Sequence, residues 1–427
     1  MKMFLFLRIF LIFIALYHIL NTIFVFGIFG GHFQTFFSFS KDLLWILFFI
    51  LLVLSNIKFF LQHLKKTWLL YILFFLLIWR SSFISFSNGK EIFDIVVWFK
   101  YWIYFFFIVI SSVFLWALIS QKNSDKRLKD FYIFLFNTLF FIIIFSLFWQ
   151  ILKFVIPWFF QKLGYWPVWD YINWQNPPIY YRTWKWWVPR LAGIFSWPNN
   201  YGFFFVSYFS FFAINIFKPK INSFSNNISQ IRKFIIYVLS VIFTISRGAI
   251  LWVWIQIIFI SKQFWSKINK KIFYLIVWVI LIWIISLTIW KWPSSLIHLQ
   301  STQKAFEFFL SNPMGYGLGT SWPAVHFHWT ILPENVFLQI LIDTGIIWFF
   351  LWIWIFAVLY IFLFKIYKKI KDKENAYIVY LKYLFFGLTW LLVEWFFLHV
   401  FEDSMVNYLF FIPFGILIGY LLFRNDL

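Results

Sequence analysis

The chain has 427 residues, of which 63% are hydrophobic and only 12% charged, and its formal net charge is +21. Soluble domains carry about 45–50% apolar and about 25% charged residues, and a single core stops growing near about 250–300 residues. This composition excludes a soluble enzyme, a nucleic-acid binder and a disordered chain, and it indicates an all-α polytopic membrane protein. The chain has no cysteine, which excludes disulfides and thiolate chemistry.

About twelve membrane-spanning helices are predicted, because a span needs about 20 mainly apolar residues. The first carries no small-residue cleavage site, so we expect a helix and not a removed signal peptide. Arg247 interrupts an apolar stretch, and a charge at mid-bilayer costs several kcal/mol, so we expect a tight turn there. The predicted spans are 3–28, 42–62, 67–87, 92–119, 131–156, 191–217, 231–246, 247–262, 271–291, 335–364, 376–398 and 404–423.

Basic residues set the expected orientation. With both termini in the cytoplasm, the internal loops hold more than twice as many Lys and Arg as the external ones, as the positive-inside tendency requires. The chain then forms a single membrane domain, 1–427, with two long external loops, 157–190 and 292–334. Loops of that length are uncommon unless they are functional.

The first external loop, 157–190, is rich in Trp and carries Arg182 and Trp187 as candidate substrate-binding residues. Aromatic faces stack on the flat apolar faces of sugar rings, but Trp is also enriched at membrane interfaces. Both interpretations stay open for this loop.

Two arginines stand at predicted external helix ends. Arg190 precedes a segment that includes Asn199, and it is either a phosphate ligand or a side chain that reaches the headgroup layer. Arg247 lies between Ser246 and Gly248, and no acidic residue is near it in sequence. A charge at that depth is a functional-site hypothesis by default, and the glycine and nearby backbone N–H groups would help to hold an anion.

The second external loop, 292–334, begins with a predicted surface helix, 296–310, that carries Lys304. It continues as Asn312-Pro313-Met314-Gly315-Tyr316-Gly317-Leu318-Gly319. The alternating glycines permit close backbone approach, for a turn or for a ligand. No Gly-Lys-Ser/Thr follows them, so this is not a P-loop.

The end of the second loop carries the candidate base. His326, His328 and Glu334 lack the His-Glu-x-x-His spacing of a zinc site, so we expect no metal. Glu334, followed by Asn335 at the top of a predicted span, is either a general base or a carboxylate favoured by the helix dipole.

Together these segments resemble the O-antigen ligase/polymerase family of bacterial membrane glycosyltransferases. The matching residues lie mainly within 185–360 and occur in the family's order. They are Arg190-x-x-Gly193-x-Phe195-x-x-Pro198-Asn199, Ser246-Arg247-Gly248, Asn312-Pro313-x-Gly315-x-Gly317-x-Gly319 and Glu334-Asn335-x-x-Leu338-x-x-x-x-Asp343-x-Gly345.

The resemblance implies transfer of a glycan from undecaprenyl pyrophosphate to a saccharide or lipid-anchored acceptor, at the outer face of the bacterial cytoplasmic (inner) membrane. It implies no cofactor, no metal and no nucleotide sugar. Arginines would hold the diphosphate, as Arg190 and Arg247 can do by charge alone. Glu334 would take the proton of the acceptor hydroxyl.

The sequence departs from the family at three places. Ligases of the family typically have His-Asn where this chain has Glu334-Asn335, so the carboxylate is more like the polymerase branch. No arginine begins the surface helix, and only His298 or Lys304 lies nearby. Trp348 stands where the family has Gly. Ligase and polymerase both stay open, and the rival from another class is a flippase or a transporter of an anionic substrate.

The chain has 29 Trp and only 15 Gly, although Gly is usually about 7% of residues. Trp278, Trp283, Trp352 and Trp354 fall deep within predicted spans, where an interfacial aromatic belt does not account for them. Two explanations of this excess stay open. In one, some glycine codons are read here as Trp. In the other, an AT-rich gene favours bulky aromatic residues.

Overall fold

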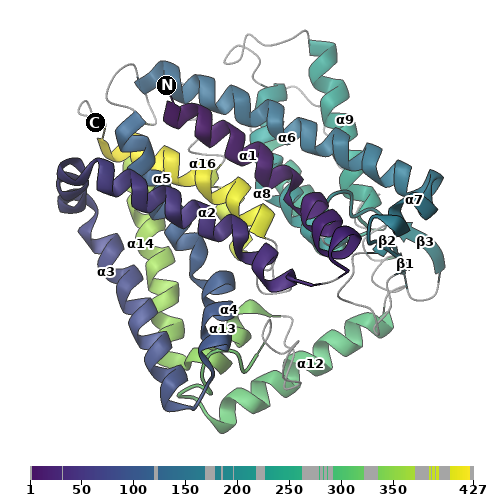
Figure 1. Ribbon diagram of the computed structural model, residues 1–427. Helices are drawn as coiled ribbons and strands as arrows, with labels where there is room; N and C mark the ends of the chain where they lie inside the picture. The colour runs from purple at the N-terminus through teal and green to yellow at the C-terminus, as the bar shows by residue number, and fades with distance from the viewer. Residues whose placement is uncertain are drawn as a thin grey trace.

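The computed structural model of the protein describes residues 2–30, 32–119, 124–168, 178–183, 186–195, 197–217, 227–261, 292–321, 335–370, 384–385, 387–389, 391–393 and 404–423, with 278, 282 and 286. It is mostly helical (Figure 1). Six of the described helices are long and apolar enough to cross a membrane. They lie within Met3–Ile28, Phe36–Ser55, Ile57–Ser87, Lys126–Val155, Ile346–Lys365 and Met405–Phe423.

The helices follow the chain in this order: α1 (Lys2–Thr22), the π-helix η1 (Ile23–Ile28), α2 (Gln34–Ser55), α3 (Ile57–Ser87), α4 (Ile92–Trp102), α5 (Tyr104–Ile119), α6 (Ser124–Val155), α7 (Pro157–Lys162), α8 (Pro198–Phe217), α9 (Asn227–Phe243), α10 (Arg247–Ser261), α12 (Trp292–Ser311), α13 (Val336–Thr344), α14 (Ile346–Ile370) and α16 (Ser404–Phe423). Of the predicted spans, 271–291 and 376–398 lie largely outside the described residues.

The α2–α3 boundary differs from the prediction. The sequence predicts spans 42–62 and 67–87 with a turn at Lys65 and Lys66, whereas α2 ends at Ser55 and those lysines lie within α3. Asn56 makes the break, because its Nδ2 donates to the carbonyl of Leu52 at 2.9 Å and its N–H to that of Val53 at 3.0 Å. Such local bonds compete with helix continuation.

Two other predicted spans are each interrupted. The span 92–119 divides at Ile103 into α4 and α5, and the span 335–364 divides at Gly345 into α13 and α14. The span predicted to begin at residue 191 becomes helical only at Pro198, which suits a first helical turn because its nitrogen has no proton to leave unpaired.

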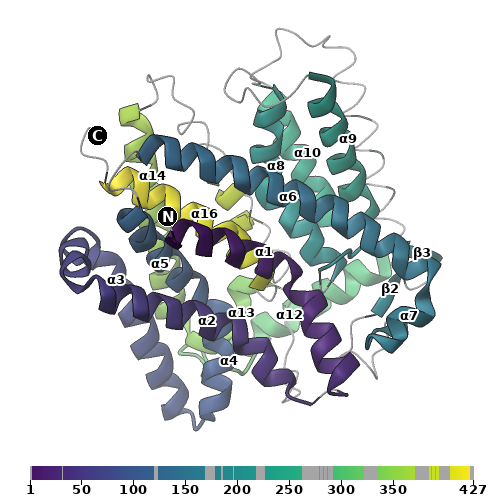
Figure 2. The same ribbon diagram turned by 45° about the horizontal axis from the view of Figure 1, so that its top comes forward.

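The segment 157–190, predicted as the first external loop, contains regular structure that the sequence analysis did not predict. After α7, strand β1 (Trp166–Val168) pairs in parallel with β2 (Pro178–Thr183), and β2 pairs antiparallel with β3 (Trp186–Arg190). Aromatic and β-branched residues favour strands. Figure 2 shows the sheet and α7 beside the end of α6.

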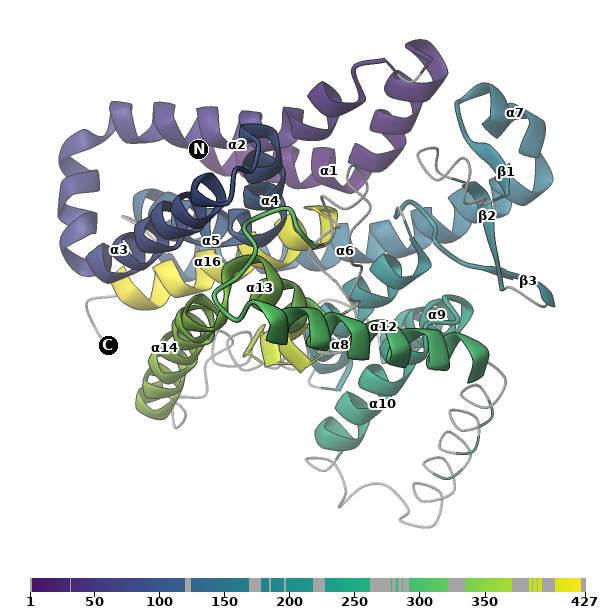
Figure 3. The same cartoon turned by 90° about the horizontal axis from the view of Figure 1, so that it is seen from below.

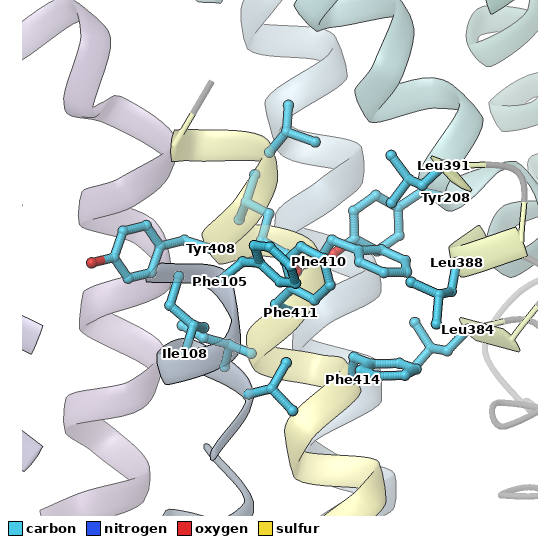
Figure 4. Close-up of a cluster of buried hydrophobic side chains, with 14 of the residues drawn as sticks. Phe105, Ile108, Tyr208, Leu384, Leu388, Leu391, Tyr408, Phe410, Phe411 and Phe414 are labelled. Carbon is cyan, nitrogen blue, oxygen red and sulfur yellow. Dashed lines mark hydrogen bonds between the residues drawn. The ribbon is translucent and has the colours of Figure 1, made fainter. Parts of the chain in front are cut away.

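The core is centred on α16, which packs along α5 (Figure 1). Gly415 and Gly419 permit the close approach, because a Cβ there would lie 2.6 Å from the carbonyl oxygen of Val109 and 2.7 Å from that of Val113. Small residues four apart are typical of close membrane helix pairs. Figure 4 shows the aromatic filling of the core, with Phe105, Phe410 and Phe411 between α5, α8 and α16.

The outer faces of α2 and α3 are apolar. Leu47, Leu54, Phe75 and Trp79 are all more than half exposed on them. A soluble protein rarely leaves contiguous apolar patches of this kind, whereas lipid covers them without cost. The exposed faces agree with a membrane protein.

Candidate functional site

The segment after β3 brings Arg190 and Asn199 together. The guanidinium Nη2 of Arg190 donates to Oδ1 of Asn199 at 2.8 Å. Its Nε donates to the carbonyl oxygen of Thr244 at 3.1 Å, and the N–H of Leu191 donates to that of Phe243 at 2.9 Å. Arg190 and Asn199 are both half-buried. The two residues are therefore attached to the end of α9, more than forty residues further along the chain.

A tight turn follows α9, at Thr244–Ser246, where the sequence predicts one. Ile245 has a φ of +48°, and the Oγ1 of Thr244 accepts from the N–H of Ser246 at 3.2 Å. Arg247 is the first residue of α10, and only its backbone is described. The start of a helix carries partial positive charge, and here it lies three residues from the carbonyl that binds Arg190.

Ser246 and Gly248 line the start of α10. The Ser246 hydroxyl is buried and has no hydrogen-bond partner among the described residues. Gly202 of α8 packs against this turn, because a Cβ there would lie 2.6 Å from that of Ala249. Arg190, Asn199 and Ser246 therefore belong to one region, between β3, α8 and the α9–α10 turn.

The Gly-rich segment packs against protein backbone. The N–H of Tyr316 donates to the carbonyl of Ile342 at 2.8 Å, that of Gly317 to Asp343 at 3.0 Å, and that of Ile346 to Pro313 at 3.0 Å. Gly315 and Gly345 approach so closely that a Cβ on Gly345 would lie 2.3 Å from the Met314 carbonyl oxygen. The backbone of this segment thus forms a turn against the α13–α14 corner, and the Gly317 N–H is bonded within the protein. The substrate-binding role of Gly317 stays a prediction.

Asn335 caps α13. Its Oδ1 accepts from the N–H of Phe337 at 2.9 Å and from that of Leu338 at 3.2 Å. This side chain has a structural function, whatever else it contacts. Its neighbour Glu334 lies outside the described residues, as does His328.

The second-loop helix, α12, packs on α13 through Ala305, Phe309, Leu338 and Ile342. It crosses one end of the molecule, with α13 and α4 near it (Figure 3). Lys304 is exposed on α12. The structure therefore places Lys304 on the helix that packs against α13, whereas Arg190 lies at the end of β3.

Arg182 and Trp187 lie in the paired strands β2 and β3, where Arg182 is opposite Pro189. Only their backbones are described. The same pairing sets Tyr181 opposite Arg190, so the sheet that carries both candidates ends at the Arg190 region.

The sequence analysis did not predict the polar residues of α6 that face this region. Gln150 and Lys153 are buried, and both bind the backbone of Gly193, three residues after Arg190. The spacing of Lys153 and Gln150 toward the end of a span was the available signal, since polar groups at that depth are rarely incidental. Within the described residues, no three His, Cys, Asp or Glu side chains are grouped as metal ligands.

Comparison of the chain with models of known protein families, with curated proteins and with solved structures gives no match.

Proposed function

We propose that the protein is an integral membrane glycosyltransferase, which transfers a glycan from an undecaprenyl-pyrophosphate carrier to a saccharide acceptor hydroxyl at the outer face of the bacterial cytoplasmic membrane. The observation that carries the proposal is the bond from Arg190 to Thr244, three residues before Arg247. Two arginine-bearing segments that are distant in sequence, and that both occur in the motifs of the family, meet at the start of one helix.

The proposed chemistry follows from charge. The acceptor oxygen attacks the anomeric carbon of the donor sugar, and the bond from that carbon to the pyrophosphate oxygen breaks. The electron pair leaves with the lipid pyrophosphate, whose growing negative charge Arg190, Arg247 and the start of α10 would stabilise. Glu334 would accept the proton of the acceptor hydroxyl. The aromatic loop would hold the glycan.

A reconstituted assay tests the proposal. Purified protein in proteoliposomes receives a glycan on undecaprenyl pyrophosphate and a saccharide acceptor, and the products are separated by size. We expect a new glycan–acceptor bond, and we expect Arg190→Ala to lower the rate about 100- to 1000-fold, as loss of one charge-stabilising donor does. Lys162→Ala is the matched control, because Lys162 is an exposed cation at the end of α7.

The flippase alternative has one observation in its favour. Discontinuous helices are common in transporters, and α4–α5 and α13–α14 are both interrupted. The backbone groups at the Gly345 interruption are, however, used by the Gly-rich segment. Donor movement across the bilayer without a new glycosidic bond would favour the flippase and reject the transferase.

A further inference from the structure

Three polar side chains follow one face of α6. Ser146, Gln150 and Lys153 are spaced by four and three residues, which aligns them on one side of a helix. All three are buried, with exposed fractions of 0%, 2% and 4%. We call them the α6 polar stripe. Polar and charged groups in a membrane helix are costly to bury, so a stripe of this kind needs a partner.

The partner is the backbone of Gly193. Its N–H donates to Oε1 of Gln150 at 3.3 Å, and its carbonyl oxygen accepts from Nζ of Lys153 at 3.4 Å. Its Cα lies against Ser146, because a Cβ on Gly193 would be 2.5 Å from the Cβ of Ser146. Gly193 also has a φ of +62°, which favours glycine. Gln150 and Lys153 therefore hydrogen-bond the two backbone groups of Gly193. Ser146 packs against its Cα, and the Ser146 hydroxyl has no hydrogen-bond partner among the described residues.

The same stripe holds the sheet. Nε2 of Gln150 donates to the carbonyl oxygen of Ile179 in β2 at 3.2 Å, and the Lys153 ammonium lies 4.4 Å from the centre of the Tyr165 ring. The segment that carries Arg190 is thus bound to α6 on both sides. Strand β2 is bound before Arg190 in sequence, and Gly193 is bound after it. Figure 2 shows the end of α6 passing beside these strands.

We infer that the α6 polar stripe positions Arg190 and Asn199 to receive the diphosphate of a lipid-linked donor, and that Lys153 and Gln150 are positioning residues which act through Gly193. The inference rests on the proposed function, since it takes Arg190 as a donor ligand. A purely apolar face on α6 would fill the same space without buried polar groups. The stripe instead fixes the peptide three residues from Arg190 and six from Asn199.

The test is a double-mutant cycle on transfer rate. We expect Lys153→Met or Gln150→Leu to lower transfer about 10- to 100-fold, the cost of a small misplacement of a reacting group. In an Arg190→Ala background the same changes should cause no further loss, because residues that act as one unit are not additive. Thr138→Val is the matched control, a buried polar change two turns before Ser146 on α6, and it should leave transfer unchanged. Two outcomes would overturn the inference. In the first, the loss in the double variant equals the product of the two single losses. In the second, Lys153→Met and Gln150→Leu leave transfer unchanged although Arg190→Ala abolishes it.

A steric rescue covers the case in which Lys153→Met does not fold. Gly193→Ala should lose transfer through two effects, the clash with Ser146 and the strain of a positive φ. Adding Ser146→Gly removes the opposing Cβ and should restore the part that the clash causes. Farnesyl pyrophosphate binding to the purified variants gives a second measurement, and its affinity should fall and recover in parallel. No recovery in the double variant contradicts the inference. If Arg190→Ala itself transfers and binds normally, the proposed function fails instead.

Discussion

The hydroxyl of Tyr408 donates to the carboxylate Oδ1 of Asp42 at 2.9 Å, which joins α16 to α2 across most of the sequence. Asp42 also pairs with Lys41, whose Nζ lies 3.1 Å from Oδ2. The hydroxyl of Tyr104 lies 2.9 Å from that of Tyr408 and donates to the Asp42 carbonyl at 2.8 Å. Lys41, Asp42 and Tyr408 are all buried.

Asp42→Asn should destabilise the protein strongly. Removing one partner of a buried ion pair leaves an uncompensated charge, here on Lys41, and costs about 3–5 kcal/mol. Thermal unfolding in detergent, followed by circular dichroism, measures the change. Glu307→Gln is the control on the exposed face of α12, where we expect a change within about 0.5 kcal/mol. Equal effects of the two changes would show that the buried carboxylate is dispensable.

Gly419→Val should separate α16 from α5. The first added carbon would already lie 2.7 Å from the Val113 carbonyl oxygen, and overpacking of this kind costs about 1–3 kcal/mol or more. Unfolding temperature measures the loss. Leu422→Val, a half-buried change one turn further along α16, should cost about 1 kcal/mol or less. A Gly419→Val protein as stable as the wild type would mean that the two helices are farther apart.

Asn335→Ala should remove the cap of α13. The loss of two accepted hydrogen bonds at a helix start costs about 0.5–2 kcal/mol. Asn335→Asp keeps the accepting oxygen and should recover most of the stability. If transfer falls much more than stability does in the Asp variant, the amide has a function beyond capping, and the prediction of a substrate-binding role would gain direct support.

Tyr165 should make stability depend on high pH. Burial raises the pKa of its phenol from 10.0 to about 12, partly offset by a hydrogen bond with Trp149. A raised folded pKa gives a contribution that is complete below pH 10 and lost as the pH rises toward 12, in total about 2–3 kcal/mol. Urea unfolding between about pH 9 and about pH 11.5 should show a shallower decline for Tyr165→Phe than for the wild type. Identical declines would contradict the predicted shift.

The sequence predicted the elements that depend on local pattern. The turn before Arg247 follows from one charge within an apolar stretch, and the start of α13 follows from the apolar stretch that begins at residue 335, whereas the capping function of Asn335 was not predicted. The contact of Arg190 with Thr244 was not predictable, because it depends on how α9 packs against the end of β3. The helix break at Asn56 was missed for a related reason, since two lysines gave a stronger turn signal than one asparagine.

The α6 polar stripe was also missed, although Lys153 was visible in the sequence as a charge within a span. Its meaning depends on Gly193, which is forty residues away. The role of Gly317 was left open for the same reason. The packed structure shows the Gly317 N–H bonded to the Asp343 carbonyl oxygen, a contact that the sequence pattern alone does not give.

The tryptophan excess retains two explanations, and position 348 separates them. The ring of Trp348 lies 5.4 Å from the Arg80 guanidinium, and its buried indole N–H has no acceptor among the described residues. Trp352 is buried, whereas Trp354 is exposed on the outer face of α14. Peptide mass spectrometry of the natural protein decides the question. Glycine at position 348 shows a recoded codon, and tryptophan assigns the excess to composition.

The Gly-rich segment is joined to the α13–α14 corner through main-chain atoms, from Tyr316 to Ile342, from Gly317 to Asp343 and from Pro313 to Ile346. Hydrogen bonds between main-chain atoms do not depend directly on which side chains these residues carry. Two side chains also hold the path, because Nδ2 of Asn312 donates to the Gly315 carbonyl oxygen at 2.9 Å and the Tyr316 ring stacks on that of Phe308. An exposed position such as Met314 can therefore change its residue during evolution while the path of the segment stays the same.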